Sequence, residues 1–211
     1  MKTMMLKAAI AGTAATLGAT AIALAPAEAT TFSLGGSLAV ESSFSYEEDG
    51  IGLTVTGLST SGPRDVVRSG LGLGVLGGFL DDPEVDGLGP NEGLQFLFDH
   101  TVSLISATFT RVGFNDDFTL FVDGDKLVSA DIPGGSFFDN DFGTFNFESF
   151  SPDNEGSVFT FAALGANDDF KLKRLEVEKV AVPEPALMLG LGSVAAAGFL
   201  AGKRSHKEEV A

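Results

Sequence analysis

The stretch Phe118-Thr119-Leu120-Phe121-Val122-Asp123-Gly124 carries the pattern that decides the fold. Phe118, Leu120 and Val122 recur at a period of two, which is typical of a β-strand with one face in a core. The Asp123-Gly124 pair that follows is a strong signal for a tight hairpin turn. This stretch therefore predicts a strand that ends in a hairpin.

The same period recurs along positions 30–182, where no long stretch has the period of an amphipathic helix. Turns rich in Gly, Asn and Asp separate these alternating runs. The pattern predicts roughly eight to ten short strands in an all-β, two-sheet, jelly-roll-like β-sandwich with an interior filled by Phe. The alternating residues are Ile51, Leu53 and Val55; Leu94, Phe96 and Phe98; Val102 and Leu104; Ala107 and Phe109, in one longer strand with the preceding pair; Phe145 and Phe147; and Phe159 and Phe161.

Two local features refine this expectation. Phe170 and Leu172 share one strand face, but Leu175 and Val177 are out of phase with them, so we expect a one-residue bulge near 173–174. The segment 113–120, GFNDDFTL, resembles 165–172, GANDDFKL. We interpret this short repeat as the same turn structure used at two places in the chain, because Asn and Asp side chains hydrogen-bond within their own loops.

Composition excludes several classes of function. The 211 residues include no Cys and carry a net charge of −16. Positions 30–182 hold 25 Asp and Glu against eight Lys and Arg, which leaves −17. A thiol nucleophile and a disulfide framework are therefore absent, and non-specific nucleic-acid binding, which requires clustered basic residues, is not expected.

Residues 1–29 have the three parts of a secretory signal peptide. Lys2 and Lys7 precede an apolar, Ala-rich run over 8–25, and the small residues Ala27 and Ala29 flank Glu28. We expect a signal helix that signal peptidase cleaves after Ala29. A retained N-terminal membrane anchor is the alternative.

The C-terminal segment 182–211 also has three parts. Pro183, Glu184 and Pro185 precede an uncharged stretch over 186–202, and Lys203 and Arg204 begin a basic tail. At ~1.5 Å per residue this stretch spans ~26 Å as a helix, close to the ~30 Å of a hydrocarbon core. The pattern predicts a single transmembrane helix with a cytoplasmic tail.

This combination of motif, apolar span and basic tail resembles the PEP-CTERM sorting signal of Gram-negative bacteria, which is also catalogued as an ice-binding protein C-terminal domain. The resemblance implies that exosortase, a membrane protease, recognises Pro183, Glu184 and Pro185, which themselves catalyse nothing. It also implies export to the cell surface or extracellular matrix. Over about 50–180, the order of glycine-rich, acidic and Phe-rich pieces resembles the β-sandwich ectodomain of many such proteins.

Enzyme motifs are weak in this chain. Gly72, Gly74 and Gly77 match a dinucleotide fingerprint in spacing, but no helix can begin directly after them, so a flexible glycine loop or a tight strand crossing is the better interpretation. His100 is the one His of positions 30–182, and we expect it at a strand end, in a turn or edge position. No G-x-S-x-G motif is present. We expect no enzymatic activity and no resident cofactor.

The acidic turns have a second interpretation as calcium sites, because calcium takes six to eight oxygen ligands. Turn formation and solubility also explain them, and both interpretations stay open. The carboxylates considered as calcium ligands are Asp116, Asp117, Asp139, Asp141, Asp168 and Asp169.

The sequence therefore predicts a signal peptide over 1–29, an acidic ectodomain over 30–181 and a sorting segment over 182–211. The expected function is a non-catalytic structural or interaction role at the cell surface or in the matrix, after anchoring in the membrane. Extracellular polysaccharide is one candidate partner. A calcium-dependent carbohydrate-binding module is the alternative, and a secreted hydrolase is a weaker one, since the domain has one Tyr and no Trp for sugar stacking.

Overall fold

The computed structural model of the chain describes residues 28–77, 82–135 and 141–181. This part is all-β, as the alternating pattern predicts, and its one helical element is the three-residue 3-10 turn Glu148–Phe150. The thirteen strands exceed the predicted eight to ten. They are β1 (Ala29–Ser33), β2 (Ala39–Glu41), β3 (Ser43–Glu48), β4 (Ile51–Ser59), β5 (Gly62–Ser69), β6 (Gly72–Leu76), β7 (Val85–Asp86), β8 (Glu92–Val112), β9 (Asp117–Val122), β10 (Asp125–Asp131), β11 (Asp141–Asn146), β12 (Glu155–Ala162) and β13 (Asp169–Lys179).

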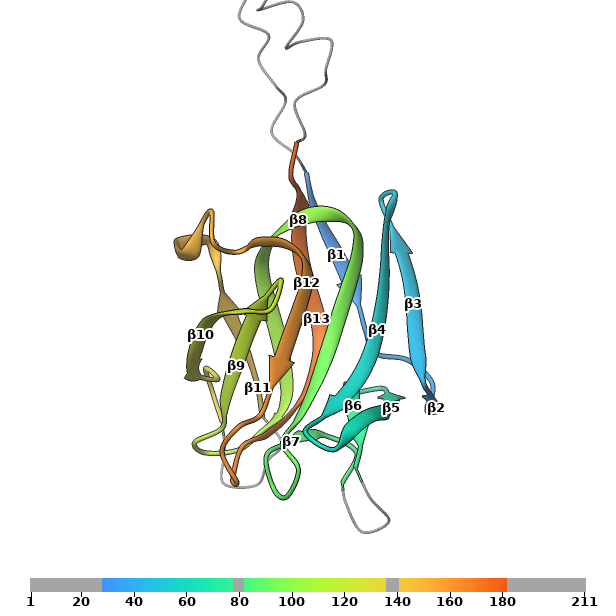
Figure 1. Cartoon of the computed structure of the whole chain (residues 1–211), viewed down its shortest axis with the longest axis vertical. Helices are drawn as coiled ribbons and strands as arrows, with labels where there is room; N and C mark the ends of the chain where they lie inside the picture. The colour runs from blue at the N-terminus through green and yellow to red at the C-terminus, as the bar shows by residue number, and fades with distance from the viewer. Residues whose placement is uncertain (1–27, 78–81, 136–140, 182–211) are drawn as a thin grey trace, which may run out of the picture.

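The 21-residue strand β8 connects the two layers of the molecule (Figure 1). Its first part, 92–98, pairs with β4 on one side and β12 on the other. Its second part pairs with β13 and β11, and β12 extends across the corner to Val102 and Ser103. His100 lies inside β8, where its partners change, so the prediction that this residue marks a strand end is wrong.

The strands form one continuous hydrogen-bonded network in place of two separate sheets. One layer contains β3, β4, β12, β9 and β10 around the first part of β8, and the other contains β1, β13 and β11 around its second part. Strands β5 and β6 connect β4 to β13. The fold is therefore sandwich-like, and β4, β5, β6, β13 and β8 close a five-strand ring.

The interior between the layers is filled by Phe side chains. Phe109 of β8 lies at the centre of this core, with ring centroids 5.0 Å from Phe118, 5.3 Å from Phe170 and 5.9 Å from Phe161. The contacts with Phe161 and Phe170 are edge-to-face, and such contacts each add about 0.5–1.5 kcal/mol beyond the burial of apolar area. Phe145, predicted to alternate inward with Phe147, is only partly buried.

Both local predictions about the strands are confirmed. The β8–β13 register shifts between Leu172 and Arg174, so the bulge returns Leu175 and Val177 to the core. The β9–β10 hairpin turns at Asp123 and Gly124, which both have positive φ, as a type I′ turn requires.

The glycine motif is part of a tight strand crossing, as expected. Gly72 and Gly74 lie in β6. A side chain at Gly72 would overlap the backbone of Leu172, and one at Gly74 would overlap the backbone of Pro83 and Glu84. The backbone of Val75 also donates to the carbonyl of Glu84 at 3.0 Å. These glycines allow close approach between strands.

In the described ranges, no helix has the length and apolar character needed to cross a membrane. The predicted signal helix (up to residue 27) and the predicted transmembrane helix over 186–202 lie outside those ranges.

Gly74→Ala should destabilise the protein by about 3 kcal/mol, because the added methyl group meets backbone atoms that cannot move independently. Gly70→Ala is the matched control, since a Cβ there meets nothing within 4 Å. Urea denaturation of both variants checks this expectation. Equal midpoints for the two variants would contradict the tight crossing at β6.

Candidate functional site

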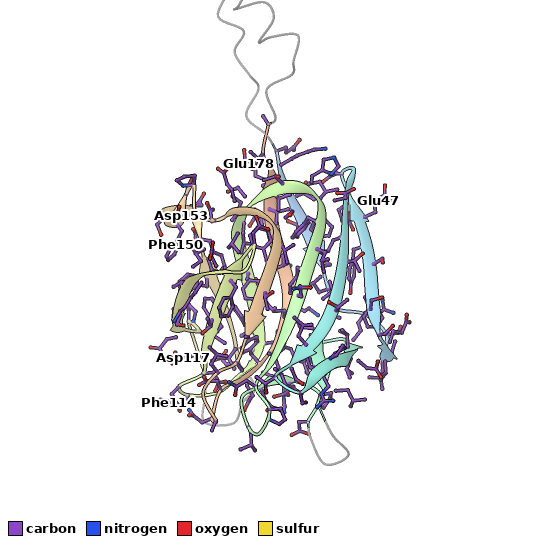
Figure 2. All side chains as sticks on the ribbon, viewed as in Figure 1. Glu47, Phe114, Asp117, Phe150, Asp153 and Glu178 are labelled. Carbon is purple, nitrogen blue, oxygen red and sulfur yellow. The ribbon has the colours of Figure 1, made fainter. Side chains whose placement is uncertain are left out.

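The described part of the chain has two distinct poles (Figure 1). At the terminal pole, β1 begins and β13 ends as antiparallel neighbours, with Ala29 opposite Glu178. The loop pole is the opposite end, where loops 87–91, 113–116, 132–135 and 163–168 meet. Figure 2 shows Phe114 and Asp117 at the loop pole and Glu178 at the terminal pole.

The repeated Asn-Asp-Asp turns lie at the loop pole and share one construction. The backbone of Gly113 donates to Asp116 Oδ2, and the backbone of Gly165 donates to Asp168 Oδ2 at 2.7 Å. Each turn leads into a strand whose second residue is a buried Phe, Phe118 in β9 and Phe170 in β13, and both of these rings contact Phe109. The interpretation as the same turn structure used at two places is confirmed.

The two turns also pair with other loops at this pole. The backbone of Ile132 donates to Asp116 O at 2.8 Å, and that of Gly87 donates to Asp168 O at 3.0 Å. Close packing of Gly135 on Gly113, and of Gly87 on Gly165, leaves no room for a Cβ at either contact. These contacts join loop 113–116 to loop 132–135 and loop 87–91 to loop 163–168.

Three carboxylates create a local excess of negative charge at this pole. Asp117 and Asp131 are cross-strand partners in β9 and β10. Desolvation first, then the hydrogen bond and charge of Asp131 and the charge of Asp168, raise the pKa of Asp117 above its usual value of 3.8. This cluster would favour a cation or a basic partner.

The structure thus gathers most of the predicted calcium ligands at one pole. Asp116, Asp117 and Asp168 belong to the twin turns, and Asp169 pairs with Asp86 of β7. Asp141 begins β11 opposite Val112, also at this pole, and Asp139 lies outside the described residues. In the ranges that the structure describes, no three His, Asp or Glu side chains are arranged to hold a metal ion. Calcium binding stays a prediction.

Four exposed apolar side chains also lie at this pole, and the sequence pattern did not predict them. Phe114 is 81% exposed, Leu88 71%, Phe142 69% and Leu164 47%. Three of them stand beside Gly in turns, where alternation gives no signal of burial or exposure. Exposed large apolar side chains gathered at one end of a domain are typical of an interaction surface. The loop pole is therefore the candidate functional site.

A partly buried ionic network lies near the loop pole. Arg111 Nε donates to Glu84 Oε1 at 2.7 Å, and Lys171 Nζ donates to the carbonyl of Pro83. Burial lowers the pKa of Lys171, and the neighbouring Arg111 charge adds to this effect, whereas the charges of Glu84 and Asp82 oppose it. Arg111 has a φ of 62°, a left-handed conformation at the end of β8. The network holds residues 83–84 against β8 and β13.

His100 pairs with its neighbour at the corner of β8. Its Nδ1 lies 2.6 Å from Asp99 Oδ1, and the backbone of Gly52 donates to the same oxygen at 2.8 Å. The hydrogen bond from His100 lowers the pKa of Asp99 below its usual value. Both side chains are exposed, so this is a surface pair that fixes the corner.

Of the residues predicted for signal cleavage and sorting, one lies in the described part of the chain. Ala29 is the first residue of β1. The other predicted processing residues lie outside the described ranges: Ala27, Pro183, Glu184, Pro185, Lys203 and Arg204.

Comparison with known proteins gives little further information. No known protein family and no curated protein matches the chain. Among solved structures, the chain is similar to the catalytic unit of a thermostable GH87 alpha-1,3-glucanase from Streptomyces thermodiastaticus strain HF3-3, at 15% identity and a TM-score of 0.36. The match covers 77% of this chain and 29% of that one. So distant a likeness carries no conclusion about function.

Asp117→Asn should raise the melting temperature at neutral pH. The folded state holds Asp117 ionised beside Asp131 and Asp168, so folding is penalised above the raised pKa, and the penalty disappears as pH falls through that pKa. The gain of the variant over the parent protein should therefore shrink in acid. Melting curves over a pH series measure it.

Asp125→Asn is the matched control, because Asp125 lies at the far end of β10 from Asp131. A gain from Asp117→Asn that persisted unchanged into acid would contradict the electrostatic account.

Proposed function

We propose that this chain is an exported, non-catalytic interaction protein of the cell surface or extracellular matrix. Signal peptidase removes residues 1–29, and exosortase recognises the PEP-CTERM segment over 182–211, whose helix anchors the chain in the membrane before processing. The acidic ectodomain over 30–181, a jelly-roll-like sandwich, then presents the loop pole to a partner such as an extracellular polysaccharide.

The single observation that carries this proposal is the pairing of the first and last strands. β1 and β13 are antiparallel, and their register places Ala29 opposite Glu178. The predicted cleavage site and the end of β13, which precedes the predicted sorting segment in the sequence, therefore lie at one pole. A chain held at that pole leaves its acidic, apolar-rich loop pole as the end farthest from the attachment, where a partner has access.

Replacement of Pro183, Glu184 and Pro185 by Ala should block processing, because these residues form the proposed recognition motif. In an exosortase-positive Gram-negative strain, the variant should accumulate as an uncleaved membrane-bound form. Immunoblots of membrane and culture fractions measure this distribution.

Glu208→Ala combined with Glu209→Ala provides the control, since it changes the same C-terminal segment but leaves the motif intact. The control should be processed like the parent chain. Equal cleavage and release of the motif variant would contradict sorting by exosortase.

Calcium-dependent carbohydrate binding is a second candidate function, and the position of Asp117 opposite Asp131 in the β9–β10 hairpin favours it. Desolvation and the neighbouring carboxylates of Asp131 and Asp168 raise the pKa of Asp117, and a bound divalent cation would relieve this repulsion. The exposed ring of Phe114 lies on the turn that leads to Asp117 and offers an apolar face beside them.

Calcium titration by calorimetry should give a heat of binding that Asp117→Asn together with Asp168→Asn abolishes. Asp153→Asn is the control, because Asp153 lies toward the terminal pole (Figure 2). Absence of binding in the parent protein would contradict the calcium hypothesis. Equal binding in the double variant and in the Asp153→Asn control would also contradict it. A glycan array with and without chelator then tests the carbohydrate part.

A further inference from the structure

The exposed large apolar residues of the described chain form two separate groups. Eight of the nine belong to them, and Leu97 is the exception. The first group is the loop-pole set already described. The second lies on β2, β6 and the β5–β6 turn, with exposures of 77% for Leu38, 49% for Val40, 49% for Leu71 and 37% for Leu76. We call this second surface the β2 patch.

The β2 patch is a connected surface. The backbone of Gly36 donates to Ser69 O at 2.9 Å, which holds the segment before β2 against the β5–β6 turn. Strand β2 itself pairs with β5 through Val40 and Val67. It is a three-residue strand at the edge of the sheet, and its Val40 side chain is 49% exposed.

Basic side chains border the β2 patch, although the domain as a whole is acidic. Arg68 Nε donates to Ser37 O at 3.4 Å, and Lys173 Nζ donates to Gly70 O beside Leu71. Arg64 and Leu76 line a common hollow of about 450 Å³. Arg64 and Arg68 belong to β5, and Lys173 belongs to β13. Strands β2 and β5 carry two acids, Glu41 and Asp65, and Asp65 is the cross-strand partner of Leu76.

The charges of the two surfaces are complementary. The loop pole places apolar side chains around Asp117, Asp131 and Asp168, and the β2 patch places them beside Arg64, Arg68 and Lys173. Two copies of a domain with net charge −17 repel each other in most orientations. In one orientation the acidic pole of one copy faces the basic patch of another. Opposite charges then attract, and both copies bury apolar area.

We propose that the partner of the loop pole is a second copy of this chain, bound through its β2 patch. The inference rests on the proposed function, since it names the partner of the same pole. The two surfaces differ, so the contact is heterologous, and each bound copy leaves one surface of each kind free. Repetition without closure builds an open chain of domains, and closure builds a ring.

The test uses residues 28–181, which contain all thirteen strands and the whole core. Sedimentation over a range of protein concentrations should show association beyond the dimer, weakened by added salt because opposite charges meet. A pole variant, Phe114→Ser with Phe142→Ser, and a patch variant, Leu38→Ser with Leu71→Ser, should each raise the dissociation constant about tenfold or more. Leu97→Ser is the control and should leave association unchanged.

Mixing the two variants distinguishes a head-to-tail contact from a symmetric one. Each variant retains the surface that the other lacks, so an equimolar mixture should form dimers and stop there. A monomeric parent protein, loss of association in only one variant, or a mixture that stays monomeric would overturn the proposal. A monomeric parent that is still exported and processed would overturn self-association alone and leave the proposed export intact.

Discussion

The structure depends on one strand that belongs to two layers. Because β8 changes partners at 99–101, a single run of backbone positions both β12 in one layer and β13 in the other. Phe109, near the end of this strand, contacts the first buried ring of β9 and of β13, and each of these rings follows an Asn-Asp-Asp turn. The geometry of the loop pole is therefore set by the core beneath it.

Alternation in the sequence was sufficient to predict the all-β class, the β9–β10 turn and the bulge in β13. It could not predict β2 and β7, which are three and two residues long and too short to show a period. In β5, Val66 and Val67 are both buried, so inward and outward residues do not alternate there. The change of partners within β8 depends on strands distant in sequence, and a pattern along β8 alone contains no sign of it.

The candidate site was predictable in its parts but not as a whole. Asn-Asp-Asp segments identify turns, and the structure confirms that their Asp side chains accept hydrogen bonds within those turns. The order of the strands brings the four loops to one end of the domain and places Asp117 near Asp168. The sequence pattern alone does not reveal this strand order. Phe114 and Leu88 stand in turns, where nothing in the local sequence indicates whether an apolar side chain is buried. The ionic network of Glu84, Arg111 and Lys171 joins three segments that are distant in sequence.

The orientation of β13 has a mechanical consequence. This strand runs from Asp169 at the loop pole to Lys179 at the terminal pole, with β1 on one side and β8 on the other. A pull between a partner at the loop pole and a tether beyond Lys179 acts along the strand, perpendicular to its interstrand hydrogen bonds. Such a shear load is shared by many bonds at once, whereas a peeling load would break them one after another. The domain is therefore arranged to resist tension along its long axis.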